Sequence, residues 1–93
     1  MTTLERAVET YGKDMQLNVA IEEFSELIKE ICKNKRGRDN VDNITEEMAD
    51  CYIMLKQLEI IFDIDFEDIR HIINNKIDRL KCRLEEGADN EQR

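Results

Sequence analysis

The sequence contains no proline and no tryptophan, and only three glycines among its 93 residues. The absence of proline and the scarcity of glycine exclude collagen-like chains, flexible linkers and β-folds rich in tight turns. No apolar run approaches the roughly 20 residues that a membrane-spanning helix needs. We therefore expect a helical protein that has no membrane partner.

The three cysteines, Cys32, Cys51 and Cys82, are odd in number and widely spaced. This pattern favours reduced thiols over a disulfide framework or a zinc site. The chain also begins without the charged segment and apolar stretch that are typical of a secretory leader. Together these features predict a cytoplasmic protein.

Acidic residues outnumber basic ones by 22 to 14, which gives a formal net charge of −8. Charged residues make up 39% of the chain, yet hydrophobic residues still reach 41%, which is too many for a disordered protein. The excess of acid argues against nucleic acid as the main partner. It suits binding of divalent cations, although it also suits plain solubility.

Apolar residues recur at helical spacing along nearly the whole chain, which predicts an all-α fold. Thr2 and Glu5 have the spacing of a capping box, and Asn43 with Glu46 resembles a second helix start. The predicted helices cover about residues 2–12, 13–35, 43–62 and 65–87. They form an antiparallel bundle in one domain over residues 1–87, and a polar tail follows over residues 88–93.

The third predicted helix carries a carboxylate where the sequence leaves little room for water. From Met48 to Leu55, Asp50 is the only charged residue, so we expect this helix to be buried on most sides, with Tyr52 in the core. An isolated buried carboxylate is costly unless it is paired or bound to a metal. Glu47 lies three residues earlier and shares the face of Asp50.

The second predicted helix offers a matching pair, Glu23 and Glu26, which also lie three residues apart. Two antiparallel helices could aim these four carboxylates at one point, where they would need a cation between them. Oxygen ligands of this kind favour Mg²⁺ or Mn²⁺. Alternatively, Glu23 and Glu26 form a solvated face, because they lie off the stripe of apolar residues that includes Phe24.

The motif Glu22-Glu23-x-x-Glu26, followed by Glu47-x-x-Asp50, resembles the E-E-x-x-E…E-x-x-D signature of the all-α nucleoside triphosphate pyrophosphatases, most closely the short MazG-like members. The residues around Asp50 and the segment from Asn75 to Leu80 add to the likeness, which covers about residues 10–86. The resemblance implies packed antiparallel helices and a Mg²⁺-dependent activity that splits a nucleoside triphosphate between its α and β phosphates.

The resemblance also implies roles for individual residues. Glu23, Glu26, Glu47 and Asp50 would hold the metal, and Lys76 and Arg79 would face the phosphates. General acid–base chemistry suggests Glu22 or Glu26 as the acceptor of a proton from the attacking water. Arg83 shares a helix face with Lys76 and Arg79, and the cluster that includes Lys35 and Arg38 offers further cations. In each case the other possibility is a solvated basic helix end.

A chain this small does not easily enclose a nucleotide and keep a core, so we expect a homodimer or a homotetramer. The expected substrate is a nucleoside triphosphate, with deoxynucleotides favoured. Two alternatives stay open: a non-catalytic helical module that binds a partner, and a phosphoribosyl-ATP pyrophosphatase of the same superfamily.

Overall fold

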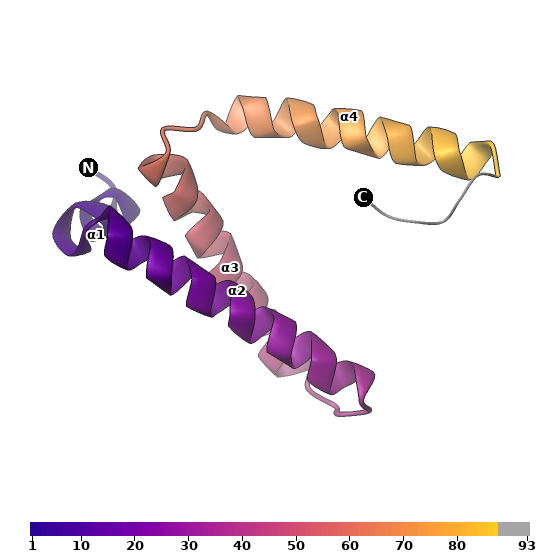
Figure 1. Ribbon diagram of the computed structural model, residues 1–93, viewed down its shortest axis with the longest axis horizontal. Helices are drawn as coiled ribbons and strands as arrows, with labels where there is room; N and C mark the ends of the chain where they lie inside the picture. The colour runs from indigo at the N-terminus through magenta and orange to yellow at the C-terminus, as the bar shows by residue number, and fades with distance from the viewer. Residues whose placement is uncertain (88–93) are drawn as a thin grey trace. The chain divides into compact units, whose positions relative to one another are not determined.

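The structure, a computed structural model, describes residues 1–87 and contains only α-helices and their connections in that range (Figure 1). The helices are α1 (Thr3–Tyr11), α2 (Lys13–Lys35), α3 (Val41–Ile61) and α4 (Phe66–Glu85). The prediction of an all-α fold is confirmed. The predicted polar tail over residues 88–93 lies outside the described residues.

The chain divides into two compact units, Met1–Asp63 and a second unit that begins at Ile64. The first unit holds α1, α2 and α3, and the second holds α4. The expectation of one domain over residues 1–87 concerns how these units are arranged, and it stays a prediction. Within residues 1–87, no helix combines the length and apolar character that crossing a membrane requires.

Capping residues set the starts of α1 and α4, and the cap of α1 is the one that the sequence predicts. The Thr2 hydroxyl accepts from the Glu5 backbone N–H at 3.1 Å, and the Glu5 carboxylate accepts from the Thr2 N–H at 2.7 Å. This capping box begins α1. The Asp65 carboxylate accepts from the Glu67 N–H at 3.0 Å and begins α4.

The predicted start of the third helix at Asn43 is wrong by two residues, because α3 begins at Val41. Asn40 occupies the cap position but makes no capping hydrogen bond there. Its side chain turns instead to Glu30 of α2. A tertiary contact therefore replaces the local cap that the sequence pattern suggests.

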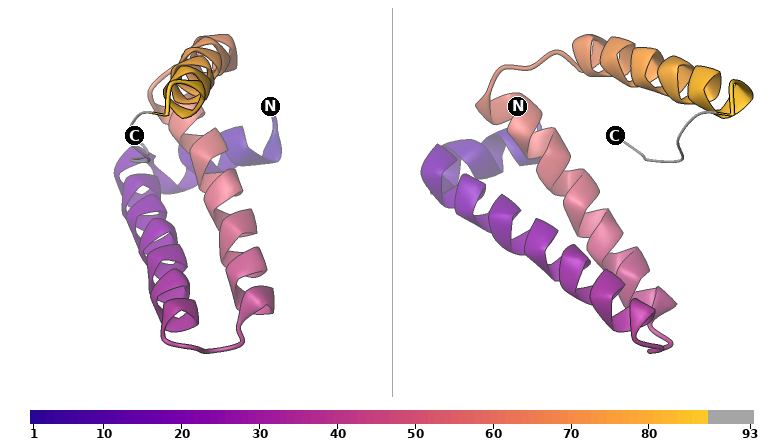
Figure 2. Two further views of the ribbon diagram at one scale, coloured as in Figure 1. Left: turned by 90° about the vertical axis from the view of Figure 1, so that its right-hand side faces the viewer. Right: turned by 45° about the vertical axis from the view of Figure 1, so that its right-hand side comes forward.

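Helices α2 and α3 form an antiparallel hairpin, joined by a short turn over residues 36–40 (Figure 2). Gly37 has a φ of 98° in this turn, a conformation that side chains with a Cβ rarely adopt. Helix α1 packs against both α2 and α3. The hairpin therefore sets which residues of α2 face which residues of α3.

The face that α2 turns toward α3 is more polar than the sequence suggests. Gln16, Ala20 and Glu30 are buried, and Glu23 is half-buried. The interpretation of Glu23 as part of a solvated face is therefore wrong. The helix contacts α3 at the border between its apolar and acidic sides, so part of the apolar stripe remains exposed, including Ile28.

Helix α3 is not buried on most sides, which corrects a second expectation. Met54 and Ile61 are buried on the face that also carries Glu47. Tyr52, expected in the core, is 65% exposed, and Leu55 is also exposed. The unit Met1–Asp63 does not supply the side chains that would cover the rest of this helix. Among the described residues of α4, none is buried.

Candidate metal centre

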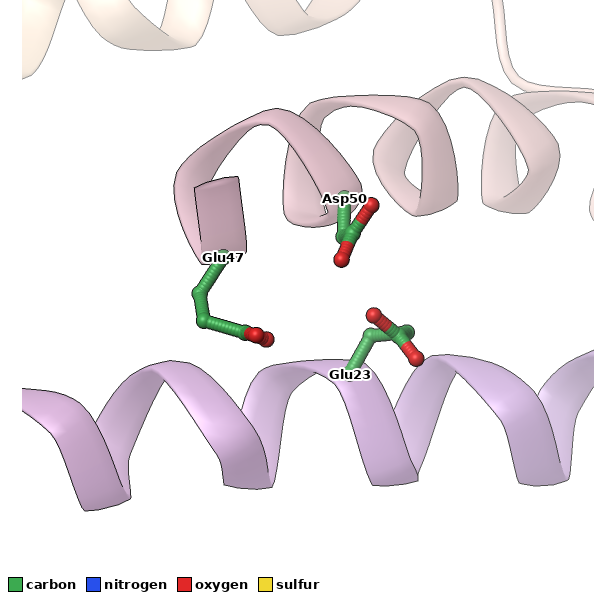
Figure 3. Close-up of side chains that lie close together, drawn as sticks. All are labelled: Glu23, Glu47 and Asp50. Atoms are coloured by element: carbon green, nitrogen blue, oxygen red, sulfur yellow. The ribbon is translucent and has the colours of Figure 1, made fainter. Parts of the chain in front are cut away.

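Three carboxylates from two helices converge at the middle of the α2–α3 hairpin (Figure 3). Glu23 belongs to α2, and Glu47 and Asp50 belong to α3. One carboxylate oxygen from each lies within 4.8 Å of the others. We call these three residues the acid cluster. All three are half-buried.

The acid cluster is the middle of three polar layers along the hairpin. On one side the Gln16 side-chain amide donates a buried hydrogen bond to the side-chain oxygen of Gln57. On the other side the Asn40 amide donates to the carboxylate of Glu30. Gln16, Glu23 and Glu30 are seven residues apart, which is two helical turns, so they lie on one face of α2.

Glu23 is held in conditions that disfavour its negative charge. Burial raises the pKa of its carboxyl, and a hydrogen bond with Asp50 raises it further. The negative charges of Asp50, Glu47 and Glu26 act in the same direction. The geometry places carboxylates close together and partly shields them from water, which is unfavourable while all are ionised.

The negative charge of Glu47 is also disfavoured, and this residue has one additional feature. Burial raises the pKa of its carboxyl, followed by the charges of Asp50, Glu26 and Glu30. Its Oε2 atom is buried and has no hydrogen-bond partner among the described residues. Buried carboxylate oxygens normally have a donor or a cation beside them. The Glu47 oxygen is therefore an exception to this rule among the described residues.

The other two glutamates of the motif lie outside the acid cluster. Glu22 and Glu26 are both exposed. Glu26 has Lys29 at 3.9 Å, an exposed pair that contributes little to stability. Its charge nevertheless acts on Glu23 and on Glu47, so it is near enough to join their electrostatics.

Glu30 is a buried carboxylate that the sequence reasoning missed. Its carboxylate accepts from the Asn40 amide at 2.8 Å and from the Lys33 ammonium at 3.0 Å. These hydrogen bonds lower the pKa of the Glu30 carboxyl, the reverse of the shifts in the acid cluster. The available signal was its spacing of two helical turns from Glu23, which places both on one face.

Cys51 is packed beside the acid cluster. The residue is buried, and its thiol donates to the Glu23 backbone carbonyl at 3.6 Å. Burial raises the pKa of this thiol, and the neighbouring carboxylates raise it further. Cys51 is therefore held as a neutral thiol that fills space between the helices.

Two of the predicted cations lie at the end of the hairpin: Lys35 is the last residue of α2, and Arg38 is on the turn. Lys35 and Arg38 are exposed. Arg38, Arg36 and Lys33 line a polar hollow of about 250 Å³ together with Gly37. Glu23 and Lys35 are separated by about 18 Å along the axis of α2, since the helix rises about 1.5 Å per residue.

The predicted cations of the last helix belong to the second unit. Lys76 and Arg79 are exposed, and Arg83 is half-buried. Their spacing places them on one side of α4, as the sequence predicts. Their position relative to the acid cluster stays a prediction.

The donor set of the acid cluster consists of oxygens only, which are the ligands that hard divalent cations prefer. The partial burial, the raised pKa values and the unpartnered Glu47 oxygen are consistent with such an ion.

Comparison of the chain with family models, with curated proteins and with solved structures finds no match.

Proposed function

We propose that the chain is a Mg²⁺-dependent nucleoside triphosphate pyrophosphohydrolase of the MazG-like kind, which converts a (d)NTP into its monophosphate and pyrophosphate. The observation that carries this proposal is the convergence of Glu23, Glu47 and Asp50, with a buried and unpartnered oxygen on Glu47. The motif resemblance described above supplies the reaction. The expected location is the cytoplasm.

Mg²⁺, or Mn²⁺ in its place, is the proposed cofactor, because carboxylates favour hard divalent ions. Glu23, Glu47 and Asp50 would hold it, with Glu26 as a further ligand. When bound, the ion would neutralise phosphate charge and lower the pKa of a bound water. The chain itself contributes the fixed spacing of the carboxylates, because rigid helices carry all of them.

Glu22 and Glu26 are the proposed acceptors of the proton from the attacking water. Both are exposed on α2 beside the acid cluster, so water and substrate can reach them. In the reaction, the oxygen of the attacking water bonds to the α or the β phosphorus. The bond between that phosphorus and the bridging oxygen breaks, and the bridging oxygen leaves with the electron pair of this bond. The proton released by the water passes to one of these carboxylates.

Cations are needed to hold a triphosphate against a chain of net charge −8. Lys35 at the end of α2 and Arg38 on the turn are two candidates. Lys76, Arg79 and Arg83 on α4 are the others, and we propose that they contact phosphates within a homodimer or a homotetramer. In such an assembly these cations could come from the same chain or from a neighbouring copy.

The decisive first measurement is isothermal titration of the full chain with Mn²⁺. We expect binding by the wild type, and at least a tenfold loss of affinity in Asp50→Asn, since loss of even an indirect partner of a metal costs about 10–100-fold. Asp78→Asn is the matched control, because this exposed aspartate lies on α4 outside the acid cluster. Equal Mn²⁺ binding by all three proteins would contradict the assignment.

The reaction itself is tested by pyrophosphate release from all canonical NTPs and dNTPs, with and without Mg²⁺. We expect release that requires the metal and that Glu47→Gln reduces at least 100-fold. Phosphoribosyl-ATP is included as a substrate of the alternative activity. Mn²⁺ binding without turnover of any substrate would favour a non-catalytic helical module.

A further inference from the structure

The layer of the hairpin next to the acid cluster contains an ionised and buried carboxylate, that of Glu30. The residue is 7% exposed. Its carboxylate accepts from the Asn40 amide at 2.8 Å and from the Lys33 ammonium at 3.0 Å. A side-chain hydrogen bond with Asn43 also contributes to the lowered pKa of the Glu30 carboxyl. Glu30 therefore keeps its negative charge at neutral pH, although burial alone would favour the neutral form.

The alignment of the two helices does not require this charge. On the other side of the acid cluster, the corresponding layer consists of two neutral amides, Gln16 and Gln57, which are buried and joined by a hydrogen bond. Glu30→Gln would keep an acceptor for the Asn40 amide, and burial of a neutral amide costs less free energy than burial of an ionised carboxylate. The hydrogen bond alone therefore does not explain why this layer contains a charge.

The charge of Glu30 acts on the acid cluster. Asn43, its partner on α3, precedes Glu47 by four residues, which is about 6 Å along the helix axis. The Glu30 charge is one of those that raise the pKa of the Glu47 carboxyl. A negative potential that disfavours another carboxylate favours a cation at the same place. Lys33 opposes this effect, but its side chain is 33% exposed and that of Glu30 is 9% exposed, so water screens the lysine more strongly.

We propose that Glu30 is a positioning residue of the proposed metal centre, whose buried charge strengthens the binding of a divalent cation at the acid cluster without contact with the ion. The inference rests on the proposed function, because it concerns the metal that the acid cluster would hold. Asn40 fixes the place of the charge through its hydrogen bonds. Lys33 partly offsets the charge, so its removal should strengthen metal binding.

The first test is isothermal titration of the full chain with Mn²⁺ at low salt, in the wild type and in Glu30→Gln. A unit charge about 10 Å from a divalent ion in water changes the affinity roughly fourfold, so we expect a loss of at least this order. Glu9→Gln is the matched control, because Glu9 is exposed on α1, outside the hairpin. Equal affinities of Glu30→Gln and the wild type would overturn the inference and leave the proposed function standing.

Lys33→Gln separates an effect of charge from an effect of structure. This change removes the ion pair but keeps the negative charge of Glu30, so we expect Mn²⁺ to bind about twofold more tightly. Loss of a merely structural contact would not tighten binding. Lys13→Gln is the matched control, because Lys13 is exposed at the start of α2, 20 residues before Lys33. Unchanged or weaker binding by Lys33→Gln would contradict the inference.

Salt gives a further readout of a charge that acts without contact. The Debye length falls from about 30 Å at 0.01 M salt to about 3 Å at 1 M. The ratio of the Mn²⁺ affinities of the wild type and Glu30→Gln should therefore approach one at high salt. A ratio that does not depend on salt would show that Glu30 acts through structure, which would overturn the inference.

The inference and the proposed function fail in different ways. Weaker Mn²⁺ binding by Glu30→Gln, together with no pyrophosphate release from any nucleotide by the wild type, would support the inference and refute the proposed activity. Absence of Mn²⁺ binding by the wild type would refute both. Circular dichroism of each variant checks that its helix content equals that of the wild type.

Discussion

Asn40 connects the start of α3 to the last turns of α2 by hydrogen bonds to Glu30. Its side-chain amide donates to the Glu30 backbone carbonyl at 2.9 Å and to the Glu30 carboxylate at 2.8 Å. Both residues are buried. One side chain thus satisfies two acceptors and fixes the approach of the two helices.

Replacement of Asn40 by alanine should destabilise the protein by about 2 kcal/mol, because buried acceptors lose their donor. For a domain of this size, that corresponds to a fall in the thermal midpoint of roughly 10 °C. Thermal unfolding followed by circular dichroism measures the change. Asn18→Ala, at an exposed position of α2, should shift the midpoint little. Equal midpoints for the two variants would contradict the proposed role of Asn40.

Met54 is 4% exposed and lies in the core between the helices. Met54→Ala should cost about 3 kcal/mol, from lost burial and from the cavity that remains. Met15→Ala is the comparison, because Met15 is exposed on α2. Urea unfolding of both variants measures the difference, and a cost for Met54→Ala below that for Met15→Ala would refute the packing described for α3.

The pH dependence of stability should reveal the strained carboxyl of Glu47. Its pKa in the folded chain lies above the ordinary value of 4.5, so between these two values the folded state binds more protons than the unfolded state. The contribution of the Glu47 carboxyl to the stability of the folded state is fully present below pH 4.5. It is lost as the pH rises through the pKa of this carboxyl in the folded chain. Glu47→Gln should therefore unfold at a higher temperature than the wild type near neutral pH.

The measurement is the thermal midpoint of both proteins in chelator, from pH 4 to pH 8. The advantage of Glu47→Gln should grow as the pH rises. Comparing the two proteins cancels the contributions of groups they share, such as the Glu30 carboxyl, whose pKa is lowered. An advantage that is largest at pH 4 would show that the sign is wrong.

Binding of a divalent metal should remove the destabilisation that the ionised Glu47 carboxylate causes at neutral pH. A ligand present at 100 times its dissociation constant stabilises the folded state by about 2.7 kcal/mol. Addition of Mn²⁺ at neutral pH should therefore raise the thermal midpoint of the wild type by roughly 15 °C, with little effect on Asp50→Asn. The same rise in both proteins would place the metal elsewhere.

The three thiols should differ in reactivity. Cys32 and Cys82 are exposed, whereas Cys51 is buried and the pKa of its thiol is raised. Because the thiolate is the reactive form, we expect two thiols to react rapidly with a disulfide reagent at pH 8 and one to react slowly. Cys51→Ser should remove only the slow phase. Loss of a rapid phase in that variant would contradict the buried placement.

Local signals predicted the helices well and their packing poorly. Caps and apolar spacing located all four helices, and the error at Asn43 arose because Asn40 is used in a tertiary contact. The face of α2 that meets α3 was not predictable from its apolar stripe. That stripe, which includes Ile28, is partly exposed, and hydrophobicity alone does not say which partner covers it.

The acid cluster was predictable in part. Glu47 and Asp50 share a face by spacing alone, and the antiparallel hairpin brings Glu23 to them. Glu26 matches the motif equally well, yet it is exposed, because it is rotated by about a sixth of a turn from Glu23 around α2. Spacing defines a face, whereas the crossing of two helices decides which residues meet.

The three polar layers between α2 and α3 have a consequence for how the hairpin aligns. A contact made only of leucines tolerates sliding by seven residues, since one methyl group simply replaces another. Here such a slide would separate Gln57 from Gln16 and Asn40 from Glu30, so both of these buried hydrogen bonds would be lost. Only one alignment keeps every pair, and in that alignment the three acids meet.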